Sequence, residues 1–135
     1  MKTLLLIFTL LFSIVVFSSS SYAEWTKVGK NVIRSIQYVD FESIRKKDGY
    51  VYWWELYDYL RPKKSGISSA KVFVQGDCKQ LQYKNLSYSL HKEQMGGGIG
   101  KIPTISKQHR VWKHPSPNSI GELTLKAVCS RRDSF

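Results

Sequence analysis

The residues able to carry out acid–base or metal chemistry are few and widely spaced. The three histidines, His91, His109 and His114, fall at an expected strand end or in expected loops, where exposure to solvent is the ordinary environment. Histidines with a lysine could cleave nucleic acid by general acid–base catalysis, but no Gly-x-Ser-x-Gly elbow, His-Glu-x-x-His helix or acidic metal loop is present. The sequence therefore predicts a non-enzymatic protein without a cofactor or metal site. A basic exported hydrolase acting on nucleic acid or cell-wall polymer is the alternative.

One carboxylate, Asp58, interrupts an otherwise apolar strand face. A buried carboxylate costs free energy unless it is paired or hydrogen-bonded. It could be a binding group, but we expect a structural hydrogen bond to a turn such as the one at Arg61.

The first residues have the pattern of a cleavable signal peptide. Lys2 supplies a positive charge, Leu4 to Phe17 form an apolar run of roughly fourteen residues, and Ser18 to Ala23 form a small, polar region. The apolar run falls short of the roughly 20 residues that span a bilayer. We predict cleavage after Ala23 and one exported domain over residues 24–135, periplasmic, secreted or at the cell surface, with no cysteine at the cleavage site for a lipoprotein anchor.

Two cysteines, Cys78 and Cys129, lie in the exported part. An oxidising compartment favours a disulfide between them, because neither has a His or Cys at metal-ligand spacing beside it. Closing a loop of about 51 residues would contribute about 4 kcal/mol to the free energy of unfolding.

The chain is arranged around a long run of strand-forming residues from Tyr50 to Leu60. Aromatic and β-branched side chains dominate it, and turn formers flank it on both sides. Successive side chains of a strand point to opposite faces. One face carries Tyr50, Tyr52, Trp54, Leu56, Asp58 and Leu60, and the other carries Val51, Trp53, Glu55, Tyr57 and Tyr59.

Shorter strand patterns flank this run and predict an antiparallel meander of about five to six strands. Asp40 is expected to cap a single helical turn at Phe41 to Ile44. The glycine-rich segment Met95 to Gly100 lacks the ending of a phosphate-binding loop and is expected to serve tight turning. The other expected strands are Glu24 to Lys30, Val32 to Asp40, Ser68 to Gln75, Leu81 to Leu90 and an edge strand at Ile105 to Lys113.

The apolar period changes to that of a helix from Ser119 onward. Glu122 lies in the first turn, Ser116 or Ser119 can cap it, and basic residues end it. The pattern predicts a helix from about Pro117 to Cys129, with a strand through Leu123 to Leu125 as the alternative. The expected fold class is α+β, an antiparallel sheet meander packed by a C-terminal helix and closed by one disulfide.

A set of spaced residues is similar to a known family. It comprises Trp25, Tyr38-Val39-Asp40, Trp54-x-Leu56-x-Asp58-Tyr59, Ser69-x-Lys71, Asp77-Cys78, Met95-Gly96-Gly97-Gly98, Trp112, Pro117-x-Ser119 and Val128-Cys129. With these residues the chain resembles the surface-adhesin protein E family over nearly all of Glu24 to Cys129. The resemblance implies an antiparallel sheet backed by a helix, the Cys78–Cys129 bond, and binding to host extracellular-matrix or plasma proteins. The matching residues imply structural roles and no catalytic one.

Charge and aromatic content together predict a binding surface. The 21 Lys and Arg exceed the 10 Asp and Glu, which favours an anionic or protein partner of the envelope or matrix, although scattered charges also serve solubility. Nucleic acid is not expected, and a homodimer or a structural envelope protein without a ligand are alternatives. We expect the helix to cover the Trp54 face. The uncovered face would then present the candidate binding residues Trp53, Tyr57, Tyr59, Phe73 and Lys71, unless the sheet curls or a loop such as Met95 to Ile102 buries it.

Overall fold

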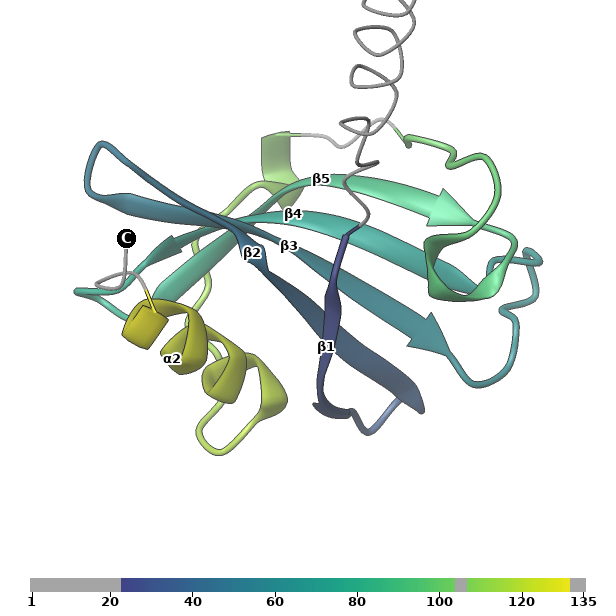
Figure 1. Cartoon of the computed structure of the whole chain (residues 1–135), viewed down its shortest axis with the longest axis horizontal. Coiled ribbons are helices and arrows are strands. Elements are labelled where there is room, and N and C mark those ends of the chain that lie inside the picture. Colours follow the sequence, from purple (N-terminus) through teal and green to yellow (C-terminus); the bar gives the residue numbers. More distant parts are fainter. Residues whose placement is uncertain (1–22, 104–106, 132–135) are drawn as a thin grey trace, which may run out of the picture.

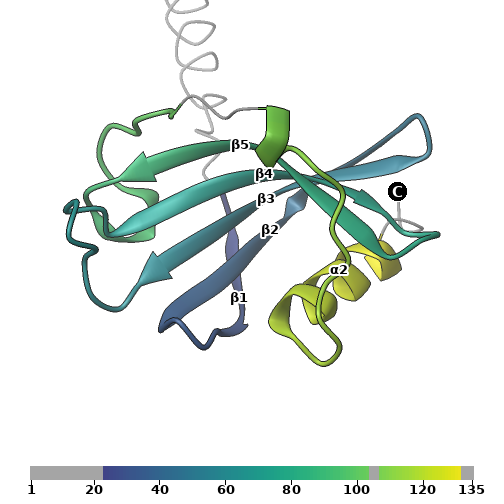
Figure 2. The same cartoon turned by 180° about the vertical axis from the view of Figure 1, so that it is seen from behind.

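The computed structural model describes residues 23–103 and 107–131, so the predicted signal peptide lies outside this part except for Ala23. Within the described residues, one antiparallel sheet holds five strands in sequence order, and a helix packs on one face (Figures 1 and 2). This arrangement confirms the predicted α+β meander. The elements are β1 (Trp25–Lys30), β2 (Ser35–Lys47), β3 (Tyr50–Tyr59), β4 (Ser69–Asp77), β5 (Gln82–His91) and α2 (Ile120–Arg131).

The central strand β3 is the expected one, and its pairing fixes the two faces of the sheet. Trp53 lies opposite Val74 of β4, and Trp54 lies opposite Phe73. Directly paired residues of antiparallel strands share a face. Trp53 and Val74 therefore lie on one face, and Trp54 and Phe73 lie on the other.

The helical turn expected after Asp40 does not form. Strand β2 continues to Lys47, and the register with β3 shifts between Asp40 and Arg45. The hydrogen bonds of a cap are present, since Glu42 N donates to Asp40 Oδ1 (3.1 Å) and Ser43 Oγ donates to Asp40 O (2.6 Å). Ser43 Oγ also accepts from Trp54 N (3.0 Å), which holds the segment to β3 as a bulge.

The prediction of an edge strand at Ile105 to Lys113 is also wrong for the residues of this segment that the structure describes. Residues 105 and 106 lie outside the described part, and Lys107–His109 form the 3-10 helix η2. Lys113 alone pairs with Tyr83 of β5, as an isolated bridge. A second 3-10 helix, η1 (Gln94–Gly96), lies in the glycine-rich segment.

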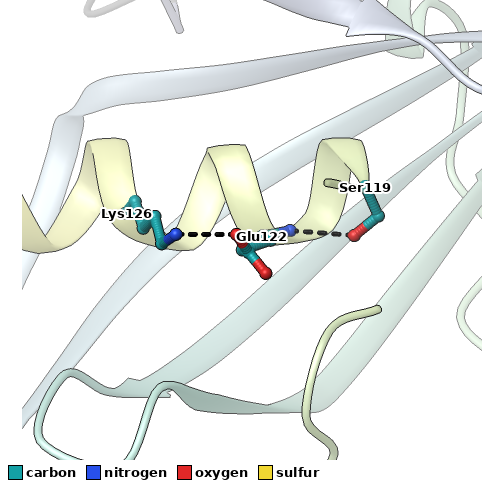
Figure 3. A network of polar contacts seen from close by, with 3 residues as sticks. All are labelled: Ser119, Glu122 and Lys126. Atoms are coloured by element: carbon teal, nitrogen blue, oxygen red, sulfur yellow. Dashed lines mark hydrogen bonds and ion pairs between the residues drawn. The ribbon is translucent and has the colours of Figure 1, made fainter. Parts of the chain in front are cut away.

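Helix α2 confirms the change of period read from the sequence. It begins at Ile120, because Ser119 Oγ accepts a hydrogen bond from Glu122 N (3.1 Å) and satisfies a donor of the first turn (Figure 3). One turn later, Lys126 Nζ lies 2.6 Å from Glu122 Oε1 (Figure 3). This pair lies on the solvent side of the helix, where it contributes little to stability.

The hydrophobic core lies between α2 and the Trp53 face of the sheet. Gly76 of β4 is needed there, because a Cβ at this position would lie 2.6 Å from Cζ3 of the Trp53 ring. The indole thus packs directly on the backbone of the neighbouring strand. The buried cluster contains Val39, Ile44, Val51, Trp53, Val72, Val74, Leu125 and Val128.

The predicted disulfide joins Cys78 and Cys129, whose Cα atoms are 5.7 Å apart. Cys78 directly follows β4, and Cys129 lies in the last turn of α2. The bond therefore fixes the end of the helix to the sheet on the side of the core.

Candidate functional site

The sheet face opposite α2 carries a row of partly exposed aromatic side chains. We call this row the aromatic strip, and it consists of Tyr50, Tyr52, Trp54, Phe73 and Trp112, all of them half-buried. Three come from alternate positions of β3, which places them on one face. Phe73 comes from β4, where the register sets it directly opposite Trp54.

The rings of the strip contact one another in sequence across the two strands. The Phe73 ring lies 4.9 Å from the Trp54 ring and 6.0 Å from the Tyr52 ring, measured between centroids. Gln75 Nε2 donates to the Tyr52 hydroxyl (3.0 Å). These contacts hold the rings in place without removing them from solvent.

Trp112 joins the strip from a distant part of the chain. Backbone hydrogen bonds of 2.9 Å in both directions between Lys113 and Tyr83 hold its segment beside β5. The Trp112 ring lies 5.4 Å from Tyr50, and Lys84 Nζ lies 4.6 Å from the centre of the same ring. The sequence analysis did not identify Trp112 as a surface residue. A usable signal was present, since Trp112 is a large aromatic residue in a segment whose strand pattern is weak.

Basic side chains surround the strip. Arg45 and Lys47 of β2 lie opposite Tyr52 and Tyr50, and Lys84 of β5 lies opposite Gln75. Lys71 of β4 lies two residues before Phe73 on the same face and packs its aliphatic stem against Gly96. Asp77 is the carboxylate nearest in β4, and it is engaged by Lys79 N (3.0 Å) and Gln80 N (3.2 Å) in the following turn. The surround therefore carries four basic side chains, beside the largely buried Asp40 that lies opposite Trp54 and accepts from Glu42 N (3.1 Å).

The structure separates the predicted binding residues into two groups. Phe73 and Lys71 lie on the face opposite α2, as expected of a surface. Trp53 is only 1% exposed and Tyr57 packs against the core, so the expectation that they line the uncovered face is wrong. Tyr59 lies at the end of β3, with Lys63 Nζ 4.3 Å from its ring centre. The reason is that α2 covers the Trp53 face and leaves Trp54 half-exposed.

A buried carboxylate explains how the core face accommodates its polar groups. Glu55 is 5% exposed, and it accepts hydrogen bonds from Tyr57 OH (2.7 Å), Trp53 Nε1 (2.9 Å) and Gln37 Nε2 (3.2 Å). Gln37 Nε2 also donates to Thr124 Oγ1 of α2 (3.3 Å). Burial raises the pKa of Glu55, against the opposing effect of the Tyr57 and Trp53 hydrogen bonds. Burial, with the nearby Glu55 charge, also raises the pKa of Tyr57 well above its usual range.

Asp58 has the structural role expected of it, with a different partner. Its Oδ1 accepts from Met95 N (2.8 Å) in the glycine-rich segment and not from the turn at Arg61. Ser69 Oγ donates to Glu93 O (2.5 Å) and accepts from Gly96 N (2.9 Å), which adds a second attachment. The segment turns tightly there, with Met95 and Gly96 both at positive φ (55° and 69°). It therefore covers the Asp58 end of the strip's face and leaves the Tyr50 end open.

The one buried histidine, His91, has structural hydrogen-bond partners. His91 is 4% exposed and not a loop residue in solvent, so that expectation is wrong for it. Its Nδ1 lies 3.1 Å from Gly97 O and its Nε2 lies 2.8 Å from Ser89 Oγ, so both ring nitrogens have structural partners. Across residues 23–103 and 107–131, no three His, Cys, Asp or Glu side chains gather closely enough to hold a metal ion. Over the same residues, no helix is sufficiently long and apolar to span a membrane.

The fold and the site define the class of protein as a small β-sheet domain. It is an antiparallel meander closed by a disulfide and backed by α2, with an aromatic face left open. The family model of surface-adhesin protein E matches residues 25–130. The chain belongs to the surface-adhesin protein E family, and it is an adhesin-like protein of the exported or cell-surface kind. No curated protein sequence matches the chain.

Solved structures of Haemophilus influenzae protein E have the same fold. Crystal form II aligns with a TM-score of 0.64 and 16% identity, over 85% of this chain and 94% of that chain. A second structure of protein E aligns with a TM-score of 0.64 and 16% identity, over 87% of this chain and 92% of that chain. Protein E from non-typeable Haemophilus influenzae aligns with a TM-score of 0.62 and 16% identity, over 86% of this chain and 82% of that chain. At this identity, the likeness carries the fold and no binding property.

Proposed function

We propose that the protein is a non-enzymatic binding domain that holds a protein partner through the aromatic strip and its basic surround. The observation that carries this proposal is the unequal covering of the two sheet faces. The Trp53 face is closed by α2, whereas five aromatic rings on the opposite face keep contact with solvent. Large aromatic side chains supply much of the binding energy at protein interfaces.

The charge of the surround suits a partner with acidic groups. Lys47, Lys71 and Lys84 lie on the same face as the strip, and the whole chain has a formal net charge of +11. Complementary charge speeds association and orients the partner, while the central rings provide most of the affinity. Membership of a surface-adhesin family supports a host matrix or plasma protein as that partner.

Binding to immobilised extracellular-matrix and plasma proteins tests the proposal, with immobilised heparin as an anionic probe that has no protein surface. The variant Tyr52→Ala/Trp54→Ala removes the centre of the strip and is expected to weaken protein binding by about tenfold or more. Heparin binding should change little, because the basic side chains remain. Leu123→Ala is the matched control, since Leu123 is 57% exposed on α2 and lies outside the strip.

The opposite pattern would overturn the proposal. If the double variant, shown to be folded by its melting curve, binds every protein of the panel as tightly as wild type, the strip is not the binding site. A milder variant, Trp54→Phe, keeps an aromatic ring and should retain most of the binding. It thereby distinguishes loss of the ring from loss of folding.

A further inference from the structure

Two neighbouring turns at one end of the sheet expose aliphatic side chains among basic ones. In a meander the β1–β2 and β3–β4 turns lie at the same end of the sheet. We call the segments 30–34 and 59–64 the turn tip. Here Leu60 N donates to Arg34 O (3.2 Å), which joins the two turns directly.

The local structure of the first turn forces two aliphatic side chains into solvent. Asn31 Oδ1 accepts from Ile33 N (3.2 Å) and Ser35 N (3.0 Å), which closes the turn, and Arg34 takes a positive φ of 59°. Val32 is consequently 99% exposed and Ile33 is 68% exposed. Leu60 of the second turn is 42% exposed. Three aliphatic groups thus project from one end of the domain, in two turns that a backbone hydrogen bond joins. Exposed aliphatic side chains also occur elsewhere, at Ile99 (98%), Ile102 (75%) and Leu123 (57%), and what distinguishes the turn tip is the set of basic residues in the same two turns.

The charged side chains of these two segments are all of one sign. Neither 30–35 nor 59–68 contains an Asp or Glu, and the nearest acidic side chain in sequence, Asp58, is turned inward to Met95 N. None of the basic side chains forms an ion pair with an acidic residue of the described part. The exposed basic residues of the turn tip are Lys30, Arg34, Arg61, Lys63 and Lys64.

The space between the turns is suited to a small anionic group. A shallow hollow of about 360 Å³ is lined by Ile33, Arg34, Tyr59, Arg61 and Lys63. Lys63 Nζ lies 4.3 Å from the centre of the Tyr59 ring, so that an aromatic ring with a polar end forms one wall. Tyrosine of this kind is typical of the boundary between lipid and water.

We propose that the turn tip docks on the surface of an anionic phospholipid bilayer. Val32, Ile33 and Leu60 enter the boundary between headgroups and acyl chains, and the five basic side chains contact headgroup phosphates. Apolar side chains ringed by Lys and Arg are the features by which peripheral proteins hold such a surface. An acidic polymer would pair with the cations alone and would make no contact that needs the exposed Val32 and Ile33. This site lies at the end of the sheet, apart from the aromatic strip, and does not depend on the proposed function.

Vesicle co-sedimentation tests the proposal with protein recovered from the exported fraction of cells that express the whole chain. The vesicles are phosphatidylcholine alone or phosphatidylcholine with about three parts in ten of phosphatidylglycerol. Wild type is expected to bind the anionic vesicles at least about tenfold more tightly. Val32→Ser/Ile33→Ser should lose about tenfold or more of that affinity, although it changes no charge.

Charge is tested by a matched pair of triple variants. Arg61→Gln/Lys63→Gln/Lys64→Gln removes three charges from the turn tip and should weaken binding to the anionic vesicles by about tenfold or more. Lys46→Gln/Lys79→Gln/Lys113→Gln removes three exposed charges near the β2–β3 and β4–β5 turns, at the other end of the sheet, and should bind nearly as wild type.

Three outcomes would overturn the proposal. Equal binding to both kinds of vesicle would exclude an anionic lipid surface. Equal losses in the two triple variants would mean that net charge acts without a site. Unchanged binding of the serine variant would leave a cationic patch that an acidic polymer such as heparin should also occupy, and the bilayer would not be its partner.

Discussion

Trp53 and Trp54 are neighbours in one strand and have opposite environments. Trp53 is 1% exposed, packs on Gly76, and donates its indole N–H to the buried Glu55 carboxylate (2.9 Å). Trp54 is half-buried and lies 4.9 Å from Phe73 on the face opposite α2. The strand gives the two residues the same backbone conformation. Their difference comes from what the rest of the chain places on each face.

The comparison shows that one sheet can have a closed core face and an open aromatic face, although both are rich in aromatic residues. The closed face combines aromatic rings with the aliphatic side chains Val72 and Val74 of β4 and receives α2. On the open face, Phe73 of β4 stands between Lys71 and Gln75, whose polar groups would be costly to bury. The face that α2 covers is therefore distinguished by its aliphatic pairs in β4, and on the opposite face the fully buried Leu56 lies toward the Asp58 end that the glycine-rich segment covers.

Truncation of the two tryptophans should give the largest difference in stability between the two faces. Trp53→Ala removes a fully buried ring and is expected to lower the free energy of unfolding by about 3–5 kcal/mol, whereas Trp54→Ala should lower it by about 1 kcal/mol. Urea denaturation of both variants beside wild type measures the difference. If the two variants lose equal stability, the open face is a second core and the aromatic strip is not a free surface.

Removal of the disulfide should weaken the cover over the Trp53 face. Cys129→Ser releases the last turn of α2 from Cys78 and is expected to cost about 2–5 kcal/mol, which corresponds to a decrease in Tm of roughly 10 °C or more for a domain of this size. Differential scanning calorimetry of the variant, and of wild type with and without reductant, gives the value. A decrease of only a degree or two in both cases would show that packing alone holds the helix.

The pH dependence of stability should show the smallest effect, and it belongs to the core face alone. Burial raises the pKa of Glu55 in the folded protein, so the folded state holds the proton at pH values where the unfolded state has released it. The free energy of unfolding should therefore fall as the pH rises from the ordinary glutamate pKa, 4.5, through the raised value. Thermal unfolding from acidic to neutral pH measures this slope.

Two glutamate variants assign the slope to its source. Glu55→Gln should remove it, and Glu122→Gln on the solvent side of α2 should retain it. A slope that persists unchanged in Glu55→Gln would mean that another group titrates, and the buried carboxylate would not be linked to folding.

Several parts of the fold could be predicted from sequence because their signals are local. The run from residue 50 to 59 contains strand formers without interruption, and Ser119, Glu122 and Lys126 mark the start of a helix by capping and charge. Local signals failed where two local structures competed. Asp40 forms the hydrogen bonds of a cap, yet pairing with β3 keeps the chain extended through Ser43. Pairing with another strand outweighed the local preference.

The candidate site depended on information that is not local. Trp112 and Tyr50 are in contact because Lys113 pairs with Tyr83, and no short pattern in the sequence predicts that bridge. The turn tip likewise requires two turns, separated by β2 and β3, to lie side by side. Its exposed aliphatic residues were visible in the sequence, but their neighbours were not.

The sequence by itself determined that Trp53 and Trp54 face opposite ways, that a helix follows Ser119, and that two cysteines in an exported chain pair. Only the tertiary structure decided which tryptophan is buried. A strand has a period of two, so its pattern is the same whichever face is covered. The β3–β4 turn sets Trp53 opposite Val74 and Trp54 opposite Phe73, and a slip of one residue in this register would have paired Trp53 with Phe73 instead. The register of that turn, together with the docking of α2, made one face the core and left the other as a surface.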